Sequence, residues 1–199
     1  MAKKIAIIGG GAAGFFTAVN LAKKNEHCSI TIYEASHKLL AKVLVSGGGR
    51  CNVTNSITEP SELAKNYPRG YQYLLKPFTQ FGSKETQQWF ENNGVKLKTE
   101  KDGRVFPITD DSRTIYNCFL DLCKEYNIDI ETSKRLIDYN KIDDHYELEF
   151  KDGKTTCDFL VLATGSNQQL YKLISNKGIE VEPPIPSLFT LNAANHTLK

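Results

Sequence analysis

The pattern of apolar and polar residues at the start of the chain predicts a strand, a helix and a second strand. Lys3 to Ile8 is a short β-branched run of the kind that forms a buried parallel strand. After a group of glycines, small and apolar residues recur at helical spacing from Phe15 to Ala22, and Ser29 to Glu34 is a second strand-like run. This order predicts a right-handed βαβ unit, the start of a doubly wound parallel sheet.

The segment that follows has a different character. From Ala35 to Pro60 no periodicity is sustained, which predicts a long functional loop. A helix is then predicted from Ser83, acting as its cap, to Gly94. A stronger apolar stripe runs from Ile115 to Tyr126 at the spacing of a helix buried on one face, so Cys118 within it is interpreted as a packed core thiol.

The remaining apolar runs predict strands. Lys96 to Thr99 and Arg104 to Phe106 are expected to pair around a turn at Asp102-Gly103. A small antiparallel meander is predicted from four runs: Ile128–Glu131, Leu136–Tyr139, Tyr146–Phe150 and Thr155–Cys157. Phe159 to Ala163 is a continuous apolar run, which suits a central parallel strand returning to the first sheet.

Composition narrows the class of protein. The 199 residues carry a formal net charge of +2 without long blocks of one sign, so neither nucleic acid nor an anionic membrane is an expected partner. The first apolar run stops at three glycines, which argues against a signal peptide, and no run approaches the roughly 18 apolar residues of a membrane span. We expect a cytoplasmic protein with five reduced cysteines and no metal site, because neither its cysteines nor its four histidines have metal-ligand spacing.

The first candidate for chemistry is the glycine motif at residues 9–14, which satisfies GxGxxG directly after a strand and at the start of a helix. Gly9 allows the tight turn, Gly11 lets the backbone approach a pyrophosphate, and Gly14 allows close packing of helix on strand. Glu34 lies 20 residues beyond Gly14 at the end of the second strand, where a carboxylate accepts hydrogen bonds from adenosine ribose hydroxyls. The alternative is a glycine-rich turn that binds nothing.

This motif does not distinguish NAD from FAD, because both present an ADP moiety. A long excursion followed by antiparallel strands favours FAD over a simple NAD domain. Ser46 to Asn52 supplies bare amides beside the guanidinium of Arg50, which suits a pyrophosphate and a flat ring; the alternative is a flexible surface loop. Arg50 could make Cys51 reactive, but we favour a packing role because no second cysteine or histidine is near. Thr164 and its neighbouring glycine would end the returning strand where ligands bind.

With these motifs together, the chain resembles a bacterial family of FAD-dependent oxidoreductases often labelled aminoacetone oxidase-like, which includes a flavoprotein associated with bile-acid dehydroxylation. The stretches that carry the resemblance are Ile5–Gly14, Val45–Asn55, Gly103–Pro107, Ala163–Gly165 and Pro186–Phe189. The resemblance implies an α/β fold, a Rossmann-like FAD-binding domain of the glutathione-reductase type with a small antiparallel β-meander. The residues expected at the cofactor are Gly9, Gly11, Ala12, Ala13, Gly14, Glu34, Lys42, Gly48, Gly49, Arg50, Cys51, Asn52, Leu136, Thr164 and Gly165.

Two departures from the family pattern matter. Where the family has Gly, a basic residue and Lys before the glycine loop, this chain has Ala41-Lys42-Val43, so Lys42 or Lys38 would have to compensate. Family members also continue into a substrate domain and a third FAD-contacting segment. We therefore expect residues 1–182 to form an incomplete FAD-binding domain, and the proline-rich residues 183–199 to be a linker into a missing substrate domain.

The function that the resemblance implies is hydride transfer through FAD, with NAD(P)H as electron donor and a small organic molecule as substrate. The rival interpretation is a non-catalytic fragment that binds FAD weakly or needs a complementing carboxyl-terminal chain. An NAD-dependent dehydrogenase ranks last, because no further helix and strand repeat directly follows Glu34. No catalytic acid, base or nucleophile can be named from these residues.

Overall fold

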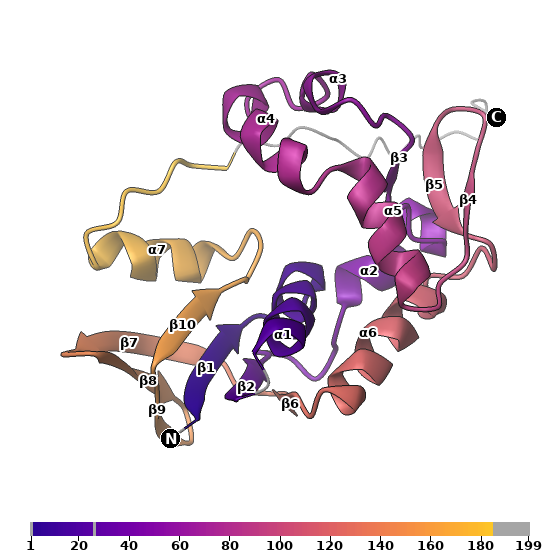
Figure 1. Cartoon of the computed structure of the whole chain (residues 1–199). Coiled ribbons are helices and arrows are strands. Elements are labelled where there is room, and N and C mark those ends of the chain that lie inside the picture. The colour runs from indigo at the N-terminus through magenta and orange to yellow at the C-terminus, as the bar shows by residue number, and fades with distance from the viewer. Residues whose placement is uncertain (1, 26, 185–199) are drawn as a thin grey trace, which may run out of the picture. The chain divides into compact units, whose positions relative to one another are not determined.

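A parallel sheet forms the centre of the fold in this computed structural model, which describes residues 2–25 and 27–184. Its strand order is β10-β1-β2-β6, and every neighbouring pair is parallel (Figure 1). The four strands are β1 (Lys3–Ile8), β2 (Cys28–Tyr33), β6 (Asp129–Glu131) and β10 (Phe159–Leu162). The predicted βαβ start is confirmed, with α1 (Ala12–Lys24) between β1 and β2.

The core lies where two helices pack on one face of this sheet. Ile7 of β1 and Ile32 of β2 are fully buried, and they join one cluster with Phe15 of α1 and Phe119 of α6 (Arg113–Glu125). The rings of Phe15 and Phe119 lie 5.9 Å apart between centroids. The predicted stripe on α6 is confirmed at four positions, because Ile115, Cys118, Phe119 and Leu122 are buried, whereas Tyr126 follows the helix as its C-cap and is only partly buried.

An antiparallel meander packs on the opposite face. It has the order β7-β8-β9, from β7 (Leu136–Ile142), β8 (His145–Phe150) and β9 (Gly153–Cys157). Side chains alternate between the two faces of a strand, so Tyr33 points away from the face that carries Ile32. The Tyr33 ring lies 4.8 Å from that of Phe150, which brings β8 against the sheet.

Two strand predictions need correction. The run at Ile128–Glu131 was expected in the meander, but β6 pairs in parallel with β2, with Ile32 opposite Ile130. The reason is that β6 follows α6 directly, and a helix before a strand returns the chain to a parallel sheet. β10 pairs in parallel with β1 as expected, but it was predicted to be central, and among the described strands it lies at one end of the sheet.

The excursion between β2 and α6 contains more regular structure than its pattern predicts. Its elements are α2 (Ala41–Val45), a 3₁₀ turn (Ser46–Gly49), β3 (Thr54–Asn55), α3 (Pro60–Ala64), α4 (Tyr71–Gln80), α5 (Ser83–Asn92), β4 (Leu97–Thr99) and β5 (Arg104–Pro107). The expected hairpin is confirmed, because β4 and β5 pair antiparallel, and β3 joins them in the order β3-β5-β4.

The cap of α5 also differs from the prediction. Gly82, rather than Ser83, precedes the helix, and the Glu85 carboxylate accepts a hydrogen bond from the Gly82 amide at 2.9 Å. Ser83 is the first helical residue, and its hydroxyl is buried without a hydrogen-bond partner among the described residues. The carboxylate three residues into the helix therefore does the capping that the sequence assigned to the serine.

Contacts divide the chain after Gly165 into two compact units, the second of which contains α7 (Gln168–Asn176). Asn167 caps α7, with its side-chain oxygen accepting from the amides of Gln169 and Leu170 at 3.0 and 3.1 Å. Of the predicted linker, residues 183 and 184 are described and lie in neither a helix nor a strand, and residues 185–199 lie outside the described residues. Among the described helices, none is long and apolar enough to cross a membrane.

Candidate functional site

The turn after β1 is built so tightly that a side chain at either Gly9 or Gly14 would collide with backbone atoms. Gly9 has φ of 120°, and a Cβ there would lie 2.5 Å from the carbonyl oxygen of Ala163. A Cβ on Gly14 would lie 1.9 Å from the carbonyl oxygen of Gly9. These two glycines therefore let the start of α1 pack against β1 and the end of β10.

Gly11 differs from Gly9 and Gly14, because the position that a side chain would take is open space. A Cβ on Gly11 would meet nothing within 4 Å, and its backbone is extended. Gly11 is the N-cap of α1, and Phe15 donates to its carbonyl at 3.1 Å, so the amides of Ala12, Ala13 and Gly14 have no acceptor within the helix. The turn thus combines an accessible backbone with the positive end of a helix dipole, which is the chemistry that binds phosphate.

Glu34 lies beside this turn, directly after β2. Its carboxylate accepts hydrogen bonds from the amides of Gly10 and Ser36, both at 2.8 Å. The amide of Lys134 donates to the Glu34 carbonyl at 2.9 Å, so the segment that leads into β7 runs beside Glu34. Leu136 opens β7 two residues further on, opposite Phe150. The roles predicted for Glu34 at a ribose and Leu136 at an adenine stay predictions.

The glycine loop after α2 has a defined conformation. Gly47, Gly48 and Gly49 all have positive φ, at 55°, 68° and 84°. A Cβ on Gly47 would lie 2.8 Å from the Asn52 amide, whereas Cβ atoms on Gly48 and Gly49 would meet nothing within 4 Å. The loop is tied to its surroundings, since the amide of Ser112 donates to the Gly49 carbonyl at 2.8 Å. Because Gly48 and Gly49 have free space beside their Cα atoms and the turn is held in place, a ligand could approach their backbone closely.

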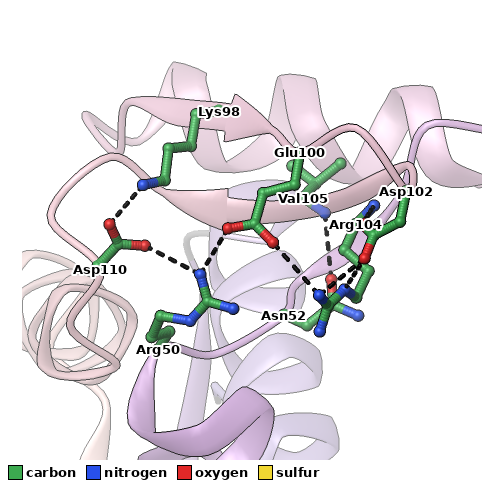
Figure 2. A network of polar contacts seen from close by, with 8 residues as sticks. All are labelled: Arg50, Asn52, Lys98, Glu100, Asp102, Arg104, Val105 and Asp110. Carbon is green, nitrogen blue, oxygen red and sulfur yellow. Dashed lines mark hydrogen bonds and ion pairs between the residues drawn. The ribbon is translucent and has the colours of Figure 1, made fainter.

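Arg50 is held by the neighbouring hairpin. Its Nη1 lies 2.6 Å from Glu100 and 3.4 Å from Asp110 (Figure 2). Its guanidinium carbon lies 4.0 Å from the centroid of the Phe106 ring. The hydrogen bond with Glu100 raises the pKa of Arg50 above its ordinary value. The contact with a pyrophosphate predicted for Arg50 stays a prediction, and in this structure two carboxylates neutralise its charge.

Cys51 has the environment of a packed thiol. It is buried, with 6% of its surface exposed, and belongs to the main core cluster. Burial raises the pKa of the Cys51 thiol, and a hydrogen bond with Ser46 opposes that rise. Because a raised pKa keeps the thiol protonated at neutral pH, the packing role favoured from the sequence fits this environment better than a reactive thiolate.

The end of β10 meets α2 at the same edge of the sheet. Ala163 donates to the Ile8 carbonyl at 2.8 Å, and Thr164 and Gly165 follow. Gly165 has φ of 59°, and a Cβ on it would lie 3.6 Å from Nζ of Lys42. The structure therefore brings Lys42 to the strand end that was predicted to contact a ligand.

A cavity of about 470 Å³ lies between these elements, within the usual range for small-molecule sites. Five residues expected at the cofactor line its wall, together with Ser46 at the start of the glycine loop: Ala12, Ala13, Lys42, Cys51 and Asn52. Sequence reasoning missed the rest of the lining, which is largely apolar and comes from α1, α5, α6 and the segments beside them: Phe16, Val43, Val53, Phe81, Thr86, Phe90, Ile115 and Phe119. Of these residues, Ile115 and Phe119 belong to a predicted helical stripe, but core packing produces such spacing equally well, so it does not point to a ligand site.

The parallel sheet, the glycine turn at the start of α1 and the carboxylate after β2 together define a Rossmann-type nucleotide-binding domain. Comparison with known proteins makes the assignment specific. The chain belongs to the family described as HI0933-like protein Rossmann domain, whose model matches residues 3–190. This match confirms the family resemblance that the sequence motifs carry.

Curated relatives match nearly all of the chain but are about twice as long. The chain is 26% identical over 201 residues to the 3-dehydro-bile acid delta(4,6)-reductase of Clostridium scindens, covering 97% of this chain and 48% of the relative. It is 28% identical over 194 residues to the ribosomal RNA dihydrouridine synthase of Haemophilus influenzae, covering 92% and 47%. The chain thus spans about half the length of the curated relatives it matches.

Solved structures show the same fold at low sequence identity. THI4 of Thermovibrio ammonificans superposes with a TM-score of 0.59 at 14% identity, covering 89% of this chain and 64% of that one. BexE superposes with a TM-score of 0.52 at 14% identity, covering 86% and 33%. These likenesses show the α/β Rossmann fold predicted from the sequence.

Proposed function

We propose that this chain is the FAD-binding half of a flavin-dependent oxidoreductase. The observation that carries the proposal is the open side of Gly11 at the start of α1, beside the carboxylate of Glu34. A second open backbone follows at Gly48 and Gly49. One such turn suits any dinucleotide, but the second loop and the adjoining cavity provide for a ligand that extends beyond ADP.

The residues fit FAD in a consistent order. The amides of Ala12 and Ala13 and the open backbone of Gly11 would hold the pyrophosphate, and Glu34 would accept from the ribose. The backbone of Leu136 would meet the adenine. The other residues that would line the flavin side are Lys42, Gly48, Gly49, Cys51, Asn52, Thr164 and Gly165, with Arg50 behind the glycine loop.

The cavity would provide the environment for the flat ring. Its walls include Phe16, Phe90 and Phe119, so a ring held there would lie against apolar surface, with Lys42 and Asn52 as polar groups at the wall. A ring bound against this apolar lining would displace water from it, and a lower local dielectric would strengthen polar contacts to the ring. When bound, FAD supplies hydride transfer, and we propose NAD(P)H as the electron donor.

The substrate class is inferred from the curated relatives. One is a delta(4,6)-reductase of a 3-dehydro-bile acid and the other makes dihydrouridine in ribosomal RNA. Saturation of a carbon–carbon double bond conjugated to a carbonyl is common to both reactions. We propose that this chain takes part in the same reaction class, and a small organic molecule is the favoured substrate because the chain carries a net charge of only +2.

The rival proposal is a non-catalytic fragment that needs a complementing carboxyl-terminal chain. Two observations favour incompleteness: the chain spans about half of its relatives, and Phe159 on β10 is 54% exposed. A parallel strand is normally covered on both faces, so an exposed phenylalanine at the end of the sheet suits a strand or domain that packs there. Under this proposal FAD binds weakly and hydride transfer requires the second chain.

A calorimetric titration of the purified chain with FAD, NAD⁺ and AMP tests the proposal. We expect FAD to bind more tightly than AMP, because it reaches the glycine loop and the cavity as well as Glu34, and NAD⁺ to compete poorly. Tighter binding of NAD⁺ than of FAD would replace the proposal with a nicotinamide-dependent dehydrogenase. FAD binding without NAD(P)H oxidation would favour the fragment.

A further inference from the structure

A network of alternating charges joins the glycine loop to the β4–β5 hairpin (Figure 2). Three cations alternate with three carboxylates in the order Lys98, Asp110, Arg50, Glu100, Arg104 and Asp102. The loop contributes only Arg50 to this network. All other members belong to the hairpin or to the segment directly after it, so Arg50 is the charged connection between the two elements. Asn52 adds an uncharged connection, since its Oδ1 accepts a hydrogen bond from the Val105 backbone amide at 3.2 Å.

Arg50 is fixed in both position and plane. Nη1 donates to Oε1 of Glu100 at 2.6 Å and lies 3.4 Å from Oδ1 of Asp110. The guanidinium also stacks over the ring of Phe106, which is fully buried and cannot move aside. The Arg50 guanidinium, which pairs with two carboxylates and stacks on the Phe106 ring, therefore has few other rotamers available.

The loop on either side of Arg50 is in a conformation that needs such support. Gly49 precedes it with φ of 84°, and Cys51 follows it with φ of 59°. A non-glycine residue with positive φ is strained, and surrounding contacts must hold it there. The Arg50 side chain therefore anchors the strained run at its middle, between the open glycines and the buried thiol.

We propose that Glu100 is a positioning residue for the glycine loop, acting through Arg50 to keep Gly48 and Gly49 in the conformation that receives a ligand. This inference rests on the proposed function, because it takes the loop as part of the FAD site. Arg50 then acts as a clamp on the loop, and Glu100 is its principal support. A direct contact between Arg50 and the pyrophosphate makes the opposite prediction, since Glu100 would then compete with the ligand for the guanidinium.

The test is Glu100→Gln, with Glu147→Gln as the matched control. The two side chains are 29% and 31% exposed, and each forms a short ion pair, Glu100 with Arg50 at 2.6 Å and Glu147 with Lys154 at 2.8 Å. Glu147 lies in the meander on β8, and neither it nor Lys154 lines the cavity. The measurements are FAD and AMP affinities by calorimetry and amide hydrogen exchange of residues 46–52 in the absence of nucleotide.

We expect Glu100→Gln to weaken FAD binding roughly tenfold, the effect of losing a charge-assisted contact, and to leave AMP binding unchanged. AMP would reach Glu34 and the α1 amides without the loop. Glu147→Gln should change neither affinity. Tighter FAD binding by Glu100→Gln would overturn the proposal in favour of competition, and unchanged FAD binding would overturn it as well. Equal weakening of FAD and AMP would indicate a general structural effect and overturn it.

Hydrogen exchange separates this proposal from the proposed function. If the unmodified chain binds no FAD, the proposed function fails, and exchange still tests whether Glu100 holds the loop. We expect faster exchange of the amides from Gly47 to Asn52 in Glu100→Gln and no change there in Glu147→Gln. Equal exchange in the two variants would overturn the positioning role.

Discussion

Gly11→Ala should separate ligand binding from folding in the turn after β1. The added methyl group would have no atom within 4 Å, and φ of −95° with ψ of −176° is accessible to alanine. The free protein therefore has room for it. The methyl group would, however, project from the N-cap of α1 into the space proposed for the pyrophosphate.

The magnitudes follow from these contacts. Alanine is a poorer N-cap than glycine, but it also reduces the entropy of the unfolded chain, so the free energy of unfolding should change by less than about 1 kcal/mol. For a chain of this size that corresponds to a shift in Tm of no more than roughly 4 °C. FAD affinity should fall at least about tenfold, or about 1.4 kcal/mol, because the backbone no longer approaches the phosphates.

The matched control is Gly14→Ala, whose methyl group would lie 1.9 Å from the Gly9 carbonyl oxygen. Overpacking of this kind costs about 1 to 3 kcal/mol or more, so its Tm should fall by roughly 2 to 12 °C. Thermal denaturation and a calorimetric FAD titration measure both effects. Wild-type FAD affinity in Gly11→Ala, with Tm unchanged, would refute the placement of the pyrophosphate at this turn.

Three further predictions concern other groups. Glu34→Gln should weaken the binding of AMP and of FAD by a similar factor, roughly tenfold, because the charge of the proposed ribose acceptor is lost. Weaker binding of FAD alone would contradict that role. Burial raises the pKa of Cys118 to about 11 and that of Cys123 to about 12. Because these thiols have a higher pKa in the folded chain than the value near 9 in the unfolded chain, they contribute stability below pH 9, and this stability is lost as the pH rises toward 12. The urea concentration at the unfolding midpoint should therefore fall between pH 8 and pH 10.5. A rise in that midpoint would contradict the burial argument. Cys28, which is only partly buried, should react with a thiol reagent at pH 8 before Cys118 and Cys123, and mass spectrometry of the labelled peptides reports the order.

Local pattern was sufficient where structure is decided by neighbouring residues. The first strand, the glycine turn and α1 follow from a β-branched run and from two glycines, Gly9 and Gly14, at which a side chain would meet backbone atoms. The stripe on α6 was equally predictable, because one-sided burial repeats every three or four residues. The carboxylate of Glu34 was found beside the turn because parallel strands end at the same edge of a sheet.

Long-range pairing was harder to predict. β6 has only three residues, and nothing within Asp129–Glu131 distinguishes a parallel edge from a meander. The helix before it was the usable signal. The same limit applies to Arg50, whose positive charge beside glycines suggested an anion, whereas its partners Glu100 and Asp110 lie 50 and 60 residues away. Helices α3 and α4 were not predicted. α3 has only five residues, and α4 contains Pro77, although Tyr71, Leu74 and Phe78 keep helical spacing along it.

A visible absorbance spectrum of the purified chain shows directly whether it binds FAD. The purified chain would be measured before and after incubation with FAD, with excess removed by gel filtration. We expect flavin bands that stay with the protein peak and diminish in Gly11→Ala. A folded chain that emerges colourless, with FAD eluting separately, would contradict this expectation.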